Sequence, residues 1–592
     1  MASATEGAGV PGDQTKMQDE RHSNESSMRD VEKKPQMLSG GAKQIFRPRI
    51  IAMACIVSMG GFIFGYDTGQ ISGFLEMPDF LQKFADQTGA PTDEYPNGAP
   101  AFSNVRSGLI VALLSIGTLL GALIAAPIAD KFGRKYSIVF WNIIFCVGVI
   151  VQITTTTTWY QIAIGRWVAG LGVGGLSVLT PMYQSETAPR YVRGALVSCY
   201  QLFITLGIFT AYCINFGTES DPSSRAWKIP MGIGFIWSGL MVAGILFMQE
   251  SPRWEYRQGK IDAARKTVAL TYGVNEDHFE VQREIREIEM KMEAERAGGG
   301  SHPWYEIFTG PRMGYRTLLG ITLQMLQQLT GANYFFYYGT TVFASVGLSN
   351  SYVTSIILGA VNFGCTFPGL YMVEKFGRRP VLIYGALWMF CMFIIFASLG
   401  HFALGPEGNQ SQSVGYGMII VACLFIAAFA STWGPVVWAV VGEIYPTRYR
   451  AKCMALATAS NWVWNFLLSF FTPFITSSID YRYGYVFAGC CFAGAVIVYF
   501  FLCESQGRSL EEIDTMYIFG VKPWHSKHWS PPEGDELPNL DSTYLTPGGR
   551  GINKKQEARA PEQTMVENVP RSEMVSSGAA APAPAHVRGE VE

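Results

Sequence analysis

The chain has 592 residues, of which 49% are hydrophobic and only 16% are charged, and its formal net charge is −2. A soluble domain carries about a quarter of charged residues, so this composition favours a membrane protein. The small net charge argues against an electrostatic nucleic-acid binder, and we expect no nucleic-acid partner. The eleven cysteines lie mostly inside apolar runs without metal-ligand spacing, so we interpret them as small core residues and expect no metal site.

Residues 1–45 are polar and rich in Ser, Gly, Lys and Glu. This composition predicts a disordered tail, and since it contains no apolar stretch we expect no cleaved signal peptide. Residues 504–592 become Pro- and Ser-rich and are also expected to be mostly disordered. Both tails are expected to offer sites for cytoplasmic regulatory partners.

Between the tails, apolar runs recur in two groups of six. Each is about as long as the twenty or so residues that a membrane-spanning helix needs, and several contain Gly or Pro. The sequence therefore predicts an all-α membrane protein with twelve transmembrane helices in two six-helix halves. The runs cover approximately 50–73, 107–128, 136–154, 160–183, 195–216 and 229–249, then 317–345, 352–373, 380–402, 414–441, 453–476 and 484–503.

These runs define the expected organisation of the chain. A first half at 46–250 and a second at 316–503 are joined by a charged linker at 251–315. Within the linker, residues 277–296 place apolar side chains among acids and bases at helical spacing, which predicts an amphipathic helix under the membrane domain.

Basic residues gather in the loops on one side of the predicted bundle, including Lys131–Lys135 and Lys375–Arg379, and in the linker. The positive-inside rule places this side, and with it both termini and the linker, in the cytoplasm. The glycosylation sequon at Asn409 falls in a loop on the other side, which agrees, although its modification stays open.

Two charges interrupt the apolar runs. Asp67 lies in the Phe64–Gly73 stretch of the first run, and Arg166 lies in the fourth. A charge at that depth costs on the order of a few kcal/mol even on the mildest scale, so each should have a partner or a function. We predict that the two form a pair that solute or proton binding makes and breaks. The alternative is that Asp67 lies near a helix end and merely reaches water.

Short acid–base motifs recur in register in the two halves. Asp130–Lys135 is echoed by Glu374–Arg379, and Glu250–Arg253 by Glu504–Arg508. Such register indicates an internal duplication, an architecture of transporters whose substrate site lies between the halves. The paired acids and arginines predict an inner latch that holds the halves together, whereas ordinary basic membrane anchors would not explain the acids. The expected latch residues are Arg134, Glu186, Arg193, Glu374, Arg378, Glu443 and Arg450.

Amides cluster in the seventh run, where Gln327, Gln328 and Asn333 precede Tyr337 and Tyr338. An amide supplies both a donor and an acceptor, as the hydroxyls of a sugar require. Amides are costly inside a membrane helix unless they are satisfied, so this cluster predicts a polar solute site. For any single amide the alternative is a hydrogen bond between helices.

Glycines at 170, 172, 174 and 175 imitate the spacing of a dinucleotide-binding loop. No strand precedes them, so we interpret them as close helix packing and expect no cofactor. The sequence also shows no nucleophile–base pair or phosphate loop in a suitable context, so no enzyme activity is expected.

The repeated Gly-Arg-basic loops, the Glu250-Ser-Pro-Arg253 stretch and Arg166–Gly174 resemble sugar porters of the major facilitator superfamily, over approximately residues 46–515. Within that superfamily the chain is most similar to fungal hexose transporters and related glucose sensors. The resemblance implies the major facilitator fold and proton coupling through Asp67 and Arg166. It further implies an outer gate at Tyr337 and Tyr338. The implied sugar contacts are Gln201, Gln327, Gln328, Asn333, Asn362, Trp438 and Asn461.

This resemblance predicts a plasma-membrane hexose transporter, with glucose as the expected sugar, that works by alternating access with proton symport. Facilitative uniport and a glucose sensor with little transport remain the alternatives, since some relatives keep the aspartate without coupling. The chain departs from some family members at Ala430, which replaces an acid, so no polar contact is assigned there. Sugar, protons and the lipid bilayer are thus the expected partners.

Overall fold

The computed structural model describes residues 48–88, 98–189, 193–297, 305–310, 312–344, 350–404, 411–446, 449–508 and 510–529. The predicted tail at 1–45, the sequon at Asn409 and most of the C-terminal tail lie outside these residues. The described chain is almost entirely helical. Its strands β1 (Gln87–Thr88) and β2 (Pro100–Ala101) form one short antiparallel pair, with Gln87 opposite Ala101.

The first half contains the six predicted helices and a short additional helix, α4. A side-chain cap starts α5, where the Ser103 hydroxyl accepts from the Arg106 N–H, and Gly133 separates α5 from α6 at a φ of 92°. The bounds are α3 (Pro48–Phe74), α4 (Pro78–Phe84), α5 (Asn104–Phe132), α6 (Arg134–Ile153), α7 (Trp159–Thr187), α8 (Arg193–Thr218) and α9 (Arg225–Phe247).

The second half differs from the prediction because two of its six runs are broken. The seventh run splits into α14 (Met313–Leu329) and α15 (Ala332–Ala344), and the tenth splits into α18 (Gln412–Ser431) and α19 (Trp433–Glu443). The other elements are α16 (Ser351–Phe376), α17 (Arg378–Ser398), the π-helix η1 (Leu399–Ala403), α20 (Arg450–Ile479), the 3-10 turn η2 (Asp480–Arg482) and α21 (Tyr483–Phe501).

A glycine causes the first break. Gly331 adopts a φ of 86°, which L side chains rarely adopt, and a Cβ atom there would lie 2.7 Å from the ring of Phe487. The second break lies at Thr432, whose φ and ψ of −129° and −86° are not helical. Both breaks lie inside the bundle, where a neighbouring helix can satisfy the freed backbone groups.

By length and apolarity, ten helices in the described part of the chain could cross a membrane. One of these, Arg450–Phe501, contains both α20 and α21, while α14 and α15 are each shorter than the 18 residues required. Counting α20 and α21 as two helices adds one segment, and counting α14 and α15 together as one adds another. The ten helices then become the twelve predicted segments.

The glycines of α7 are packing residues, as predicted. A Cβ atom on Gly170 would lie 2.3 Å from the Leu114 carbonyl oxygen of α5, and one on Gly174 would lie 2.1 Å from that of Thr118. Gly172 is similarly close to Phe145 of α6, at 2.6 Å. The absence of side chains therefore lets α7 lie against the backbones of two neighbouring helices.

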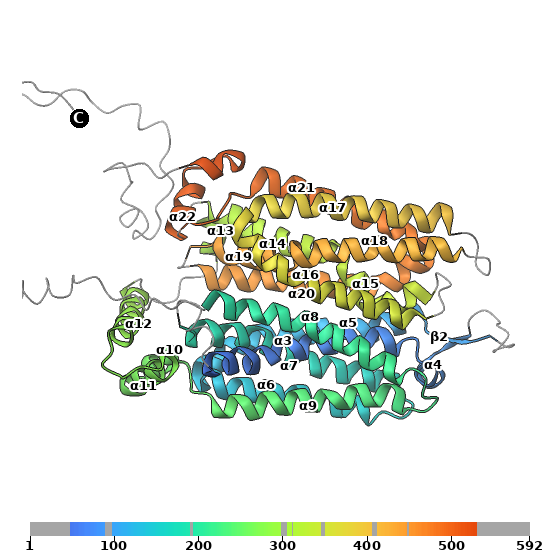
Figure 1. The fold of residues 1–592 in the computed structure, drawn as a ribbon, viewed down its shortest axis with the longest axis horizontal. Coiled ribbons are helices and arrows are strands. Elements are labelled where there is room, and N and C mark those ends of the chain that lie inside the picture. Colours follow the sequence, from blue (N-terminus) through green and yellow to red (C-terminus); the bar gives the residue numbers. More distant parts are fainter. Residues whose placement is uncertain are drawn as a thin grey trace, which may run out of the picture. The chain divides into compact units, whose positions relative to one another are not determined.

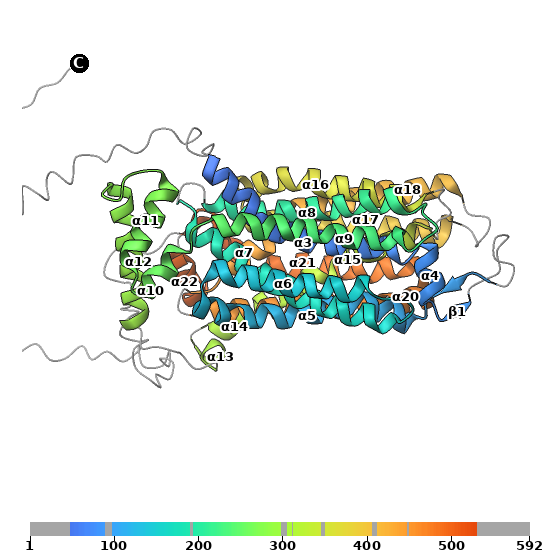
Figure 2. The same ribbon diagram turned by 90° about the horizontal axis from the view of Figure 1, so that it is seen from below.

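The halves lie side by side, with the first half in blue and green and the second in yellow and orange (Figure 1; Figure 2 gives the perpendicular view). Helices α3, α5 and α8 of the first half pack on α15, α20 and α16 of the second, respectively. The substrate site predicted between the halves would therefore be lined by these six helices.

The linker forms α10 (Pro252–Arg257), α11 (Ile261–Tyr272), α12 (Phe279–Ala297) and α13 (Glu306–Thr309). The predicted amphipathic helix is α12, whose Val281 and Ile288 are buried against Val268 and Tyr272 of α11. After α21 follow α22 (Leu510–Ile518) and the 3-10 helix η3 (Pro523–His528). We call the end of the bundle that carries the linker helices the basic end, and the end that carries α4 and the strands the opposite end.

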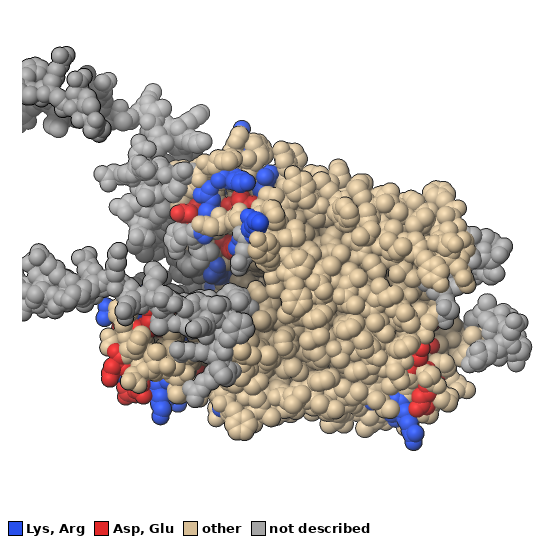
Figure 3. Space-filling view, viewed as in Figure 1, with Lys and Arg blue, Asp and Glu red and all other residues tan. Residues whose placement is uncertain are grey.

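Charged residues in the described chain gather at these two ends, and the face of the bundle between them is free of described charges in the view of Figure 3. Large apolar side chains such as Phe140, Ile236 and Tyr384 are exposed on the bundle, at 46%, 56% and 73%. A charge-free belt with exposed apolar side chains is what contact with lipid requires.

Candidate functional site

The structure brings Asp67 of α3 and Arg166 of α7 together inside the first half. Nη1 of Arg166 lies 3.8 Å from Oδ2 of Asp67, and the two side chains are 0% and 1% exposed, respectively. The other oxygen, Oδ1, accepts a hydrogen bond of 2.7 Å from Nε2 of Gln70, one turn along α3. The ion pair is thus buried, and the hydrogen bond to its carboxylate comes from a neutral amide.

A group of amide side chains connects α14, α15 and α20. Nδ2 of Asn461 donates to Oε1 of Gln327 at 2.7 Å and to Oε1 of Gln324 at 2.8 Å. Gln328 donates to Oδ1 of Asn461 at 2.9 Å and accepts from Asn333 at 2.5 Å. We call this group the amide cluster, and its members are Gln324, Gln327, Gln328, Asn333, Asn461 and Asn465.

Helical spacing places these amides on shared faces. Gln324, Gln327 and Gln328 are three and four residues apart on α14, and Asn461 and Asn465 are four apart on α20. The break before α19 contributes as well, because Nε2 of Gln327 donates to the carbonyl oxygens of Trp433 and Gly434 at 3.0 and 2.9 Å.

Asn465 was not among the predicted sugar contacts, yet it links the two halves. Its Oδ1 accepts from the Ser115 hydroxyl of α5 at 2.6 Å and from the Tyr337 hydroxyl of α15 at 3.1 Å, while its Nδ2 donates to Gln328 at 3.2 Å. Gln324 was also missed. The sequence did hold a signal for these amides, since each lies four residues from a predicted contact, whereas no pattern pointed to Ser115.

The two tyrosines of the predicted outer gate lie buried on α15 and contact α20. Tyr337 reaches the amide cluster through Asn465, and Tyr338 donates to the backbone carbonyl of Ser469 at 2.6 Å. The aromatic side chains therefore lie next to the amide cluster.

Three predicted sugar contacts lie outside the amide cluster, two of them on helices of the interface between the halves and the third on α19. Gln201 is half-buried on α8, Asn362 is buried on α16, and Trp438 is half-buried on α19. Among the described residues, none of the three takes part in the hydrogen bonds of the amide cluster. The structure therefore brings together only the contacts predicted on α14, α15 and α20.

Hydrogen bonds between the halves gather at the opposite end. The Ser72 and Thr340 hydroxyls are 2.8 Å apart, and the Thr341 hydroxyl donates to Oε1 of Glu76 at 2.7 Å. The Tyr352 hydroxyl donates to the Gly73 carbonyl at 2.9 Å. The end of α3 is thereby joined to α15 and α16, which closes the bundle at that end.

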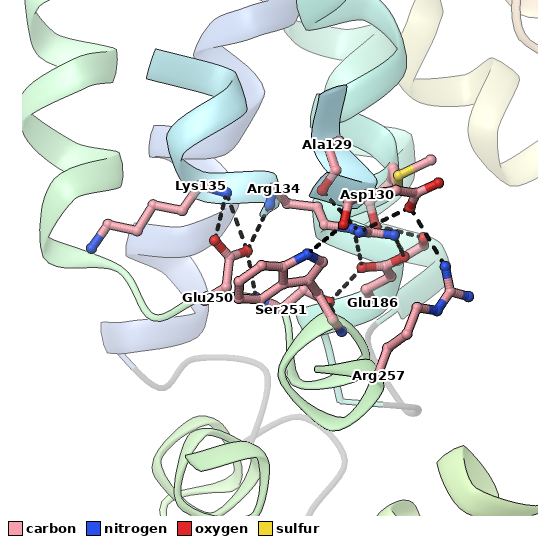
Figure 4. A network of polar contacts seen from close by, with 11 residues as sticks. Ala129, Asp130, Arg134, Lys135, Glu186, Glu250, Ser251 and Arg257 are labelled. Atoms are coloured by element: carbon pink, nitrogen blue, oxygen red, sulfur yellow. Dashed lines mark hydrogen bonds and ion pairs between the residues drawn. The ribbon is translucent and has the colours of Figure 1, made fainter. Parts of the chain in front are cut away.

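A network of ion pairs braces the first half at the basic end (Figure 4). Nε of Arg134 lies 3.0 Å from Glu186, and the backbone N–H of Arg134 donates to Oε1 of Glu250 at 2.8 Å. Figure 4 shows Arg134 between the two carboxylates, with Ser251 donating to Glu186. Burial raises the pKa of Glu250, although N–H groups of Ser251, Lys135 and Arg134 donate to its carboxylate and oppose that rise.

The second half repeats this network. Nη2 of Arg378 lies 3.0 Å from Oε1 of Glu443, the backbone N–H of Arg378 donates to Glu504 at 2.9 Å, and Ser505 donates to Glu443 at 2.6 Å. Equivalent residues thus make equivalent bonds in both halves, which supports the internal duplication inferred from sequence. The side chain of Glu374 lies outside the described residues.

These ion pairs lie within each half rather than between the halves, which differs from the expected latch. Arg134 joins α6 to α7, and Arg378 joins α17 to α19. Arg193 does not bond Glu186 but lies 3.2 Å from Glu284 on the linker helix α12, and Arg450 donates to the Gly442 carbonyl at 2.7 Å. Motif spacing revealed the charged groups but not which helices pack together.

A cavity of about 140 Å³ lies at the basic end, away from the amides. Residues of α3, α7, α9 and α11 line it, including Ile50, Tyr183, Phe247 and Leu270. Its walls are mostly apolar, so it does not suit a polyol. The donors and acceptors that a polar solute requires lie instead in the amide cluster.

A family model described as sugar (and other) transporter matches residues 53–517. The chain belongs to the sugar transporter family. The low-affinity glucose transporter HXT3 of Saccharomyces cerevisiae is 48% identical over 486 residues, which cover 81% of this chain and 84% of the relative. The high-affinity fructose transporter ght6 of Schizosaccharomyces pombe is 46% identical over 480 residues, covering 80% and 88%. These relatives are transporters, and the chain is a transporter rather than an enzyme.

Solved structures of the sugar transporter family share this fold. The inward-open xylose transporter XylE of E. coli matches with a TM-score of 0.64 at 25% identity, over 79% of this chain and 99% of XylE. The proton:xylose symporter XylE bound to 6-bromo-6-deoxy-D-glucose matches with a TM-score of 0.64 at 26% identity, over 79% and 98%. The chain is therefore a multi-pass membrane transporter with the major facilitator fold.

Proposed function

We propose that this protein transports hexoses across the plasma membrane by alternating access, coupled to protons, with both termini in the cytoplasm. The observation that carries the proposal is the amide cluster, whose member Asn465 accepts from Ser115 where α20 and α5 of the two halves meet. Relatives named as glucose and fructose transporters support a hexose as the substrate.

The amide cluster suits a hexose because each amide presents a donor and an acceptor, as each sugar hydroxyl does. Its bonds are now made among the amides themselves, such as Gln328 to Asn461. A sugar would exchange these bonds for its own, so the amides that now bond one another would stay satisfied, and Nε2 of Gln324, which has no partner among the described residues, would gain one. Trp438 and Tyr337 offer flat apolar surfaces for the ring faces.

Proton coupling would act through Asp67 and Arg166. An ionised Asp67 is attracted to Arg166, whereas a protonated carboxyl is not, so proton binding weakens the contact between α3 and α7. The C-terminal end of α3 bonds the second half through Ser72 and through Glu76, which lies two residues after the helix. A proton on Asp67 is therefore in a position to change closure at the opposite end, and the name proton:xylose symporter for the related XylE supports this coupling.

The closed opposite end and the match to inward-open XylE support an inward-facing state. In this assignment the basic end is cytoplasmic, in agreement with its arginines and lysines. Uniport, in which Asp67 and Arg166 are only structural, is the second candidate, and the names of relatives as glucose transporters without mention of protons favour it.

Uptake of radiolabelled glucose in cells that lack their own hexose carriers tests the proposal. We expect saturable uptake by the wild-type chain that is reduced at least tenfold in Gln328→Leu. Gln161→Leu is the control, because the described side-chain bonds of Gln161 stay at the turn between α6 and α7, with the Val151 carbonyl, Thr154 and Thr158. Surface-expressed protein that takes up no hexose would contradict transport and favour a sensor.

A further inference from the structure

Gln70 lies beside the buried ion pair and has no assigned part in it. Its side chain is 3% exposed on α3, one turn beyond Asp67, and its Nε2 donates to Oδ1 of Asp67 at 2.7 Å. The backbone carbonyl of Gln70 accepts from Nδ2 of Asn215 on α8 at 2.9 Å, which fixes this turn of α3 against a second helix. The amide is therefore held where it contacts the carboxylate.

Several polar atoms around the pair are buried without a hydrogen bond among the described residues. They are Oδ2 of Asp67, Oε1 of Gln70, and Nε, Nη1 and Nη2 of Arg166. Arg166 thus contributes charge at 3.8 Å but donates no hydrogen bond to the carboxylate, and Gln70 supplies the short one. Burying a guanidinium whose N–H groups make no hydrogen bonds costs free energy, so this arrangement is expected to have a function.

The amide can serve either protonation state of Asp67. An ionised carboxylate accepts from the Nε2 group, as seen here. A protonated carboxyl can donate its O–H to Oε1, which has no partner among the residues that the structure describes. Hydrogen bonds to a charged group are stronger than those between neutral groups. Gln70 therefore keeps Asp67 in place in both states but favours the ionised one.

We propose that Gln70 is a positioning residue for proton coupling, which holds the Asp67 carboxyl away from a hydrogen bond with Arg166 and sets the pH at which the pair opens. This inference rests on the proposed proton-coupled transport. The other titratable or charged groups that face Asp67 are Arg166 on α7, Tyr337 on α15 and Tyr66 on α3 itself. Of these, only Arg166 is cationic.

The test is the pH profile of hexose uptake in the full-length chain, with proton uptake recorded alongside. Gln70→Met keeps the length of the side chain but removes donor and acceptor. We expect the pH of half-maximal uptake to shift by about one unit toward alkaline pH, since the ionised carboxylate loses its strongest bond. Gln70→Leu is the second variant if the methionine variant does not reach the membrane, and it should shift the profile in the same direction.

Thr68→Val is the matched control, because the Thr68 hydroxyl is buried next to Asp67 but has no hydrogen-bond partner in the described part of the chain. The pH profile of Thr68→Val should match that of the wild type. In Gln70→Met, the KM for sugar at the optimal pH should also equal the wild-type value. If the wild type takes up protons with sugar but neither Gln70 variant shifts the pH profile, the role of Gln70 is overturned and the proposed function stays intact. Sugar uptake by the wild type without proton uptake would overturn the coupling, and the role of Gln70 with it.

Discussion

The Ser115 hydroxyl of α5 donates to Oδ1 of Asn465 on α20 at 2.6 Å, which joins the first half directly to the amide cluster of the second. Both side chains are buried, at 1% and 3% exposure. Because α5 and α20 belong to different halves, this bond connects the amide cluster to the relative position of the halves.

Ser115→Ala is expected to raise the KM for hexose by about three- to tenfold, because the loss of one buried hydrogen bond costs about 0.5–1.5 kcal/mol. Ser177→Ala is the control, since the Ser177 hydroxyl bonds only the Gly174 carbonyl of its own helix. Uptake at varied sugar concentration measures both. Equal KM values in the two variants would show that the bond between Ser115 and Asn465 has no part in sugar binding.

Asn465→Leu is expected to impair binding more strongly than Ser115→Ala, because it also removes the acceptor of the Tyr337 hydroxyl and one of the two bonds that Oε1 of Gln328 accepts. An unsatisfied buried group costs about 1–3 kcal/mol, so we expect at least a tenfold loss of affinity. Binding of hexose to purified protein, measured by calorimetry, checks this value. An affinity within a factor of two of the wild type would exclude Asn465 from the site.

Closure at the opposite end should depend on pH through Glu76. Burial raises the pKa of Glu76, although the Thr341 hydroxyl donates to it and opposes that rise. The closed state therefore binds this proton more tightly than an open state that exposes Glu76 to water. This contribution to closure is complete below the ordinary pKa of an exposed Glu, about 4.3, and is lost as the pH rises through the raised pKa.

A cysteine at Leu75, which is buried at 4% exposure, reports this closure through its reaction with an impermeant thiol reagent. Labelling of any thiol becomes faster with pH because the thiolate fraction rises, so each rate is corrected for the chain without that cysteine and divided by the rate of the same reagent with a free thiol. We expect this ratio for Leu75→Cys to increase as the pH rises from 4 to 8. Adding Glu76→Gln, which fixes a neutral side chain, should keep the ratio low at every pH. A ratio that still increases in the double variant would assign the effect to another group.

The two ion-pair networks at the basic end should differ in strength. The Arg134 and Glu186 side chains are 5% and 11% exposed, whereas those of Arg378 and Glu443 are 18% and 25% exposed. Breaking a buried pair costs about 3–5 kcal/mol, and solvent reduces this cost at exposed pairs. Arg134→Ala should therefore lower the thermal stability of the purified protein more than Arg378→Ala does. The reverse order would mean that burial does not determine the strength of these networks.

The helices could be predicted from sequence because apolar runs of membrane-spanning length are unambiguous. The breaks at Gly331 and Thr432 were not predicted, since each run keeps membrane-spanning length through its break and the change lies in the backbone conformation. The break before α19 matters for the site, because it brings the Trp433 carbonyl to Gln327.

The candidate site was predictable in part. Gln327, Gln328 and Asn461 were found because amides in apolar runs stand out, and Asn465 could have been found from its spacing of four residues after Asn461. Ser115 could not, since a serine in a membrane helix most often bonds its own backbone. The partners of the arginines also escaped prediction, because they depend on which helices pack together.

The most direct test of proton-coupled hexose transport is uptake by proteoliposomes that contain only this protein, with a pH gradient imposed across the membrane. The wild type should accumulate glucose above its external concentration while the gradient lasts, and Asp67→Asn should only equilibrate it, because a fixed neutral side chain cannot exchange a proton. Equilibration by the wild type, unaffected by the gradient, would contradict coupling and leave Asp67 as a structural partner of Arg166.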